Sequence, residues 1–154
     1  MKPTPLDEFP VHQTPLPMAQ VGTSDRNFYD RYYLNAHDRT GEVFLVTGFG
    51  AYPNLGVVDA FATVRHGDTQ RSVRFSDALD ARSLEPAVGG YRIEVIEPLR
   101  TLRLVCEHPD LSMDMTWEGS FDAILEDQHV LLEGTHAMLD ASRFAQVGSW
   151  SGTL

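Results

Sequence analysis

The segment from residue 111 to residue 121 alternates between apolar and polar side chains without a break. Its odd positions are Leu, Met, Met, Trp, Gly and Phe, and its even positions are Ser, Asp, Thr, Glu and Ser. A period of two places successive side chains on opposite faces of a β-strand. One face of this strand would be dry and the other wet, which is typical of an antiparallel sheet packed on a core.

Other segments have the length and composition of strands, and Gly- or Pro-containing turns separate them. We expect these strands at residues 28–34, 43–50, 57–66, 70–75, 91–97, 101–107, 129–132 and 142–150. The segment 43–50 is almost entirely apolar, which favours burial on both faces. Only residues 77–84 and 137–141 are compatible with a short helical turn. Many strands at spacings of about 8–12 residues predict an all-β fold, either an antiparallel barrel or a β-sandwich.

The length of the chain and the positions of its prolines define its organisation. A chain of 154 residues corresponds to one domain and buries enough surface to fold without a disulfide or metal. Five of the nine prolines lie within the first 17 residues, and each fixes φ and removes a backbone donor. We therefore expect residues 1–23 to be a Pro-rich extended arm, disordered or laid across a partner surface, followed by a β-domain over residues 24–154.

The formal net charge of −10 limits the classes of partner. Nucleic acids and anionic membrane surfaces both recruit Lys and Arg, so neither is an expected partner. Residues 94–140 hold eleven acidic and two basic side chains. This excess indicates either a solvated, solubilising face or an acidic docking surface for a basic partner.

The sequence also bears on the compartment. The N-terminal residues have no apolar run of the kind found in secretory signals, and no segment approaches the roughly 20 apolar residues of a membrane span. The single cysteine, Cys106, falls within an apolar alternation, which is typical of a reduced thiol in a core. We therefore expect a cytoplasmic protein without membrane insertion.

The chain lacks the familiar catalytic and cofactor motifs. It contains no GxSxG, no phosphate-binding GxxxxGK[ST], no HExxH and no paired CxxC. Its six histidines show no metal-ligand spacing, and those at 66 and 108 fall in turns, so we expect no metal and no cofactor. His37 follows an aromatic strand; it is either a turn residue or a functional residue at the mouth of a barrel.

Asp59 is a second candidate catalytic residue. In the strand 57–66 it shares one face with Val57 and Phe61, while the other face is small and apolar. A carboxylate in this position lies either at a solvated sheet surface, in a structural pair, or inside a cavity. Inside a cavity, desolvation would raise its pKa and make it a possible proton donor.

Large aromatic and thioether side chains form the candidate ligand-binding set. Barrels of about eight strands can hold one small ligand among such residues, although a packed core needs the same residue types. The candidates are Tyr32, Phe61, Met113, Met115, Trp117, Phe144 and Trp150.

A family resemblance adds to this interpretation. It is carried by residues 31–68, RFSDAL at 74–79, YRIEVIEPLRTLRLVC at 91–106, TWEGSF at 116–121 and RFAQVGSWSG at 143–152. These stretches resemble bacterial two-domain lipocalin-like proteins related to hydroxyneurosporene synthase, a carotenoid 1,2-hydratase. The resemblance implies two consecutive lipocalin-like barrels or half-barrels that bind ligands in or between them, without metal or nucleotide.

The chain departs from that family where the second half would begin. Residues 148–154 stop there, and the Asp-x-Ser-Trp-Gly type of motif is absent. We therefore expect a fragment, a processed chain or a reduced relative with one half. The expected function is binding of an apolar small molecule such as a terpenoid, polyketide or lipid. An alternative, by analogy with the hydratases, is acid catalysis on an unsaturated apolar substrate, with Asp59 as the acid and Tyr32 or His37 orienting the substrate. A third is docking of a partner, a second copy or a second half through an unpaired last strand and the Pro-rich arm.

Overall fold

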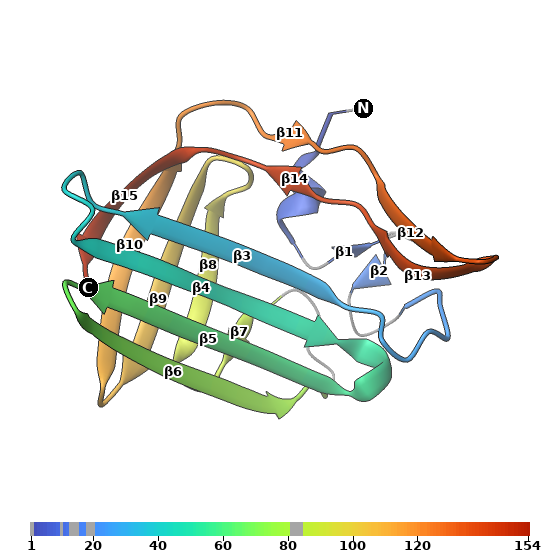
Figure 1. The fold of residues 1–154 in the computed structure, drawn as a ribbon, viewed down its shortest axis with the longest axis horizontal. Helices are drawn as coiled ribbons and strands as arrows, with labels where there is room; N and C mark the ends of the chain where they lie inside the picture. Colours follow the sequence, from blue (N-terminus) through green and yellow to red (C-terminus); the bar gives the residue numbers. More distant parts are fainter. Residues whose placement is uncertain (1, 10, 13–15, 18–20, 81–84) are drawn as a thin grey trace.

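Two antiparallel sheets packed face to face form the body of the molecule (Figure 1). The computed structural model describes residues 2–9, 11–12, 16–17, 21–80 and 85–154. The first sheet has the order β3 (Asp30–His37), β4 (Val43–Tyr52), β5 (Val57–His66) and β6 (Thr69–Ala78). The second has the order β15 (Gly148–Thr153), β10 (Leu111–Gly119), β9 (Thr101–His108), β8 (Tyr91–Glu97) and β7 (Ala87–Val88). Its strands cross behind the first sheet at a steep angle.

Several short elements lie at one end of this sandwich. A 3-10 turn, η1 (Pro5–Glu8), and two short paired strands, β1 (Val11–His12) and β2 (Leu16–Pro17), precede the first sheet, and η2 (Pro53–Leu55) lies between β4 and β5. A two-stranded ribbon projects from the second sheet before β15 (Figure 1). It comprises β11 (Ile124–Leu125), β12 (His129–Glu133), β13 (His136–Ala141) and β14 (Phe144–Ala145).

The core lies between the inner faces of the two sheets. The first sheet contributes Leu45, Phe49, Val58, Ala60, Ala62 and Val73, and the second contributes Tyr91, Ile93, Leu102, Leu104, Cys106, Met113 and Trp117. Each of these strands presents alternate residues inward, as a period of two requires. Cys106 is free and buried, and burial raises the pKa of its thiol to about 11.

One polar pair lies within this apolar interior. Thr47 and Tyr91 are fully buried and come from facing sheets. Thr47 Oγ1 donates to the carbonyl oxygen of Phe61 at 2.7 Å and lies 2.9 Å from the Tyr91 hydroxyl, with which it also forms a hydrogen bond. Because both hydroxyls have partners, the pair links the sheets without leaving a buried polar group unsatisfied.

The outer face of β4 is covered by aromatic side chains from its neighbours. A Cβ atom at Gly48 would lie 2.5 Å from the carbonyl oxygen of Tyr32 and 3.1 Å from Cε1 of Phe61. Glycine at this position therefore lets the Phe61 ring lie across the strand, as aromatic residues do over glycines in sheets. Thus both faces of β4 are largely covered near Gly48 and Gly50, as its apolar composition predicts.

Among the described residues the all-β class is confirmed, and both main sheets are antiparallel. Neither sheet closes into a barrel, so the architecture is an open sandwich or half-barrel. The predicted helical turn at 137–141 is wrong, because these residues pair with β12 within β13. Residues 77 and 78 belong to β6, and 81–84 lie outside the described residues.

Two expectations about the ends of the chain also need correction. The N-terminal arm is not extended throughout, because Pro5–Glu8 forms a 3-10 turn. The segment 142–150 is not one strand: it divides into β14 and the start of β15. β15 pairs with β10 along its length, with Trp150 opposite Trp117. It is the terminal strand of the second sheet, so within the described residues its other edge has no neighbouring strand, as expected for the last strand.

The inward orientation of Met113 can be tested against its neighbour on the opposite face. Met113 is 1% exposed in the core, whereas Ser112 is exposed. We expect Met113→Ala to lower the free energy of unfolding by about 2–5 kcal/mol, because it leaves a cavity. Ser112→Ala should change it by less than about 0.5 kcal/mol. Urea unfolding followed by tryptophan fluorescence measures both, and equal effects would contradict the assigned faces.

Candidate functional site

The N-terminal turn docks on the end of the sandwich through a buried carboxylate. Glu8, at the end of η1, is only 3% exposed. Its Oε2 accepts a hydrogen bond from the backbone N–H of Leu99 at 2.7 Å, across 91 residues of sequence. The Tyr32 hydroxyl donates to the backbone carbonyl of Glu8. The turn is therefore attached to both sheets, to the second at the β8–β9 turn and to the first at β3.

The β8–β9 turn connects this docking site with the base of the ribbon. Leu99 has a φ of 60°, which is uncommon for a residue with a side chain. Its N–H binds Glu8, and its carbonyl accepts a hydrogen bond from Gln146 Nε2 at 2.7 Å. Gln146 Nε2 also donates to the carbonyl of Phe121 at 2.9 Å. Both polar groups of the Leu99 backbone thus have partners from outside the turn.

A second acidic side chain faces inward close to this end. Asp30 begins β3 opposite the buried Ala51, two residues before the inward-facing Tyr32, and is partly buried. Burial raises the pKa of Asp30 to about 6, although the Arg31 N–H opposes the shift by donating to its Oδ1 at 2.9 Å. Burial also raises the pKa of Glu8. The pKa of Tyr32 is raised by its own burial and then by the charges of Glu8 and Asp30, which places the three groups in one neighbourhood.

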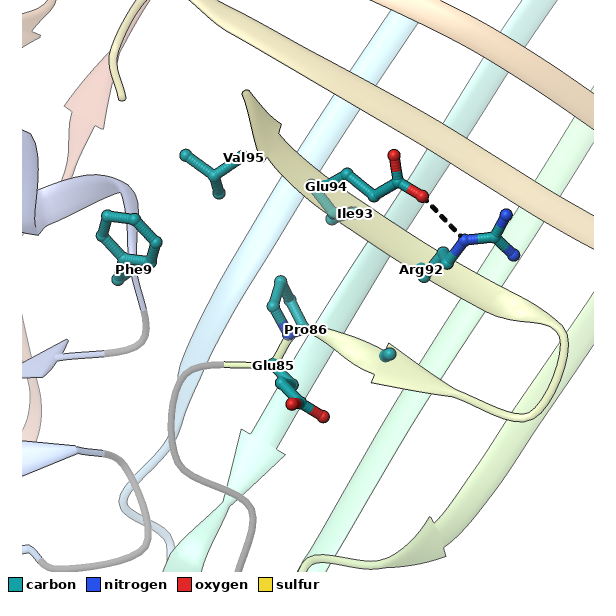
Figure 2. A pocket seen from close by; sticks show the side chains of 8 residues that line it. Phe9, Glu85, Pro86, Arg92, Ile93, Glu94 and Val95 are labelled. Carbon is teal, nitrogen blue, oxygen red and sulfur yellow. Dashed lines mark hydrogen bonds and ion pairs between the residues drawn. The ribbon is translucent and has the colours of Figure 1, made fainter. Parts of the chain in front are cut away.

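A hollow of about 320 Å³ lies between the N-terminal turn and the β7–β8 hairpin (Figure 2). Its apolar walls are Phe9, Pro86, Ala87, Ile93 and Val95, and its polar groups are Glu85, Arg92 and Glu94. Figure 2 shows Phe9 approaching from the N-terminal segment, opposite β8, with the ion pair between Arg92 and Glu94 on the far side. Arg92 Nε lies 2.9 Å from Glu94 Oε1. A second, more polar hollow adjoins it and shares Glu85 and Ala87.

The structure gives the seven candidate ligand-binding residues different positions. Met113 and Trp117 are core residues, and Tyr32, Met115 and Trp150 pack against the same core. Phe61 lies on the outer face of the first sheet over Gly48, and Phe144 lies in β14 of the ribbon. None of the seven lines either hollow. Five of them are thus brought together, but within packed interior.

The two candidate catalytic residues lie outside this interior. The Tyr52 hydroxyl donates to Asp59 Oδ1 at 3.3 Å on the outer face of the first sheet. Arg31 donates to the same hydroxyl and lies 5.6 Å from the ring centroid of Tyr29. Asp59 therefore belongs to an outer aromatic and charged cluster, in a structural pair. His37 is exposed at the end of β3, where its Nδ1 lies 2.9 Å from the carbonyl oxygen of Asp38.

Comparison with known proteins gives one match. The chain matches a family of unknown function, DUF8625, over residues 4–154. It belongs to this family. No curated protein and no solved structure matches the chain. The function proposed for this DUF8625 protein therefore rests on the geometry of its own residues.

Sequence reasoning did not identify Glu8, Phe9, Asp30 or the β7–β8 hairpin as parts of a DUF8625 site. Glu8 lies in a Pro-rich segment that predicts an arm, and its partner is distant in sequence. A signal was available for Asp30, which stands two residues before Tyr32 and so shares its face. In the described part of the chain, no group of three or more His, Cys, Asp or Glu side chains has a metal-binding arrangement. No helix there is long and apolar enough to cross a membrane.

The raised pKa of Asp30 predicts a pH-dependent stability. An unfolded aspartate ionises near pH 4, whereas folded Asp30 ionises near 6. Its contribution is therefore complete below about pH 4 and is lost as the pH rises through 6, by at most about 3 kcal/mol. We expect Asp30→Asn to match the wild type at pH 4 and to be more stable than it at pH 8. Urea unfolding at the two pH values measures this; a variant less stable at pH 8 would contradict it.

Proposed function

We propose that this protein binds a small, mainly apolar molecule in the hollow between Phe9 and the β7–β8 hairpin. The observation that carries the proposal is the hollow itself, which five apolar residues line: Phe9, Pro86, Ala87, Ile93 and Val95. Its volume of about 320 Å³ lies at the lower end of the range for ligand pockets, about 300–1,000 Å³. It suits a small terpenoid or lipid-like molecule, or one end of a longer one.

The polar groups at the hollow would orient such a ligand. Arg92 already pairs with Glu94 at 2.9 Å and with Glu107 at 3.6 Å, so its charge is largely compensated. Glu85 adds a further negative charge at the edge. A neutral or weakly polar head group is therefore favoured over an anionic one, because an anion would meet more carboxylates than free cations.

Binding is favoured over catalysis by the positions of the acidic groups. Acid catalysis requires a proton donor within hydrogen-bond reach of the substrate. Asp59 lies on the outer face, and neither Glu8 nor Asp30 lines the hollow. The carboxylates that do line it are Glu85 at its edge and Glu94, and the hydrogen bond with Arg92 lowers the pKa of Glu94, which makes it a poor proton donor. Glu8 instead anchors the segment that carries Phe9, which is a positioning role.

Two apolar probes test the proposal, geraniol as a neutral ligand and decanoate as an anionic one. We expect geraniol to bind more tightly and to shift the backbone amide NMR signals of residues 9, 87, 93 and 95. Val95→Phe should weaken binding by about tenfold or more, because the larger ring fills the hollow.

Ile96→Phe is the matched control, since Ile96 is adjacent, 59% exposed and not part of the wall. It should bind geraniol as the wild type does. Circular dichroism of both variants checks that they fold. Equal affinity for wild type and Val95→Phe, or shifts confined to residues outside the hollow, would refute the proposed site.

A further inference from the structure

Exposed large apolar side chains are concentrated in the ribbon formed by residues 124–145 and in the residues that flank it. Of the fourteen large apolar side chains that are exposed in the described residues, seven lie between residues 121 and 147. They are Phe121, Ile124, Val130, Leu131, Leu132, Met138 and Val147. Contiguous exposed apolar residues of this kind mark interaction surfaces.

Both faces of the ribbon carry such side chains. The register of the ribbon shifts between Leu131 and Leu132, and the extra residue, Met138, belongs to β13. β12 itself therefore keeps its alternation, and Leu131 points away from the face that carries Val130 and Leu132. All three are at least 46% exposed. The sandwich therefore does not bury either face, and the projecting position of the ribbon in Figure 1 agrees with this.

The backbone of the ribbon is also open. β12 and β13 form a two-stranded sheet, so within the described residues each has one edge without a neighbouring strand. Open edges accept further strands through their free N–H and C=O groups. An isolated two-stranded hairpin is marginal in water, so an added strand would stabilise it.

The negative charge of the ribbon indicates which kind of partner would bind to it. Residues 124–145 contain Glu126, Asp127, Glu133 and Asp140 but only one Lys or Arg, Arg143; the segment also holds two histidines, at 129 and 136. Arg143 already forms an ion pair with Glu126. Two copies of this ribbon would bring like charges together, in a chain whose net charge is −10. A cationic strand would instead satisfy the carboxylates and the apolar faces together.

We propose that the ribbon binds an extended segment in which Lys or Arg alternates with apolar residues, added as a strand to the edge of β12 or β13. Alternation matches the ribbon because one face of the added strand meets Val130 and Leu132 while its backbone completes the ladder. This site is separate from the hollow and does not depend on the proposed small-molecule binding.

The experiment uses three labelled eight-residue peptides with Lys–Val, Glu–Val and Lys–Ser repeats, and measures fluorescence anisotropy. We expect only Lys–Val to bind, with an affinity that falls between 50 and 300 mM salt because exposed charges are screened. Asp127→Lys/Glu133→Lys should weaken binding by about tenfold or more. Val130→Ser/Leu132→Ser should weaken it as well.

Glu42→Lys/Asp68→Lys is the matched control, because it makes the same change in net charge at exposed turns of the first sheet. It should bind within about twofold of the wild type. Equal losses in the two charge variants, or no binding of the Lys–Val peptide, would overturn the proposal. So would a dimer in sedimentation that Val130→Ser/Leu132→Ser dissociates, since it would assign the ribbon to a second copy.

Discussion

Two sheets that are each apolar on one face can remove those faces from water only by packing against each other. This burial orders the whole molecule, because it fixes the register of every main strand: a shift by one residue would turn Met113 and Trp117 outward. The sheets are not joined into a barrel, so contacts at their edges must hold them in place. One such contact is the hydrogen bond from Trp150 Nε1 to the carbonyl of Asn35, at 3.1 Å, between β15 and β3.

An open sandwich leaves its ends to be covered by other parts of the chain. Here the N-terminal turn covers one end, and the side chain that it buries there is the carboxylate of Glu8 rather than an apolar group. Burial of Glu8 is costly, and its raised pKa records that cost. Two effects offset this cost. The backbone N–H of Leu99, whose φ is 60°, gains a hydrogen-bond partner, and Phe9 is held at the hollow that Pro86 and Val95 also line. The hollow therefore depends on the docking of a segment whose own sequence resembles a flexible arm.

The sequence predicts features that depend on neighbouring residues, but it does not predict contacts between residues that are distant in the chain. Alternation in residues 57–66 and 111–117 correctly separates inner from outer faces, because a period of two is local to each strand. The prediction is wrong at Phe121, which follows the end of β10 and is 69% exposed. The interpretation of Asp59 as a surface or structural group agrees with its pairing to Tyr52 for that reason. Glu8 and Leu99 are 91 residues apart, and no local pattern reports such a contact. The prediction of a helical turn at residues 137–141 is wrong for a different reason. The composition of this segment is compatible with a helical turn, but its pairing with β12 overrides that local preference.

The apolar side chains of the ribbon need a different explanation from those of the sandwich core, because they are exposed. Inner faces of the main sheets are apolar because they meet each other, whereas Val130, Leu131 and Leu132 are apolar without meeting the rest of the domain. About half of the surface of each of these three side chains stays exposed, and exposed apolar hairpins risk aggregation. If the ribbon binds a cationic strand as proposed, the four carboxylates have two roles: they keep free ribbons apart, and they attract the partner whose apolar side chains cover the ribbon. Because Gln146 ties the base of the ribbon to the Leu99 turn, an added strand would be held at a defined position relative to the hollow.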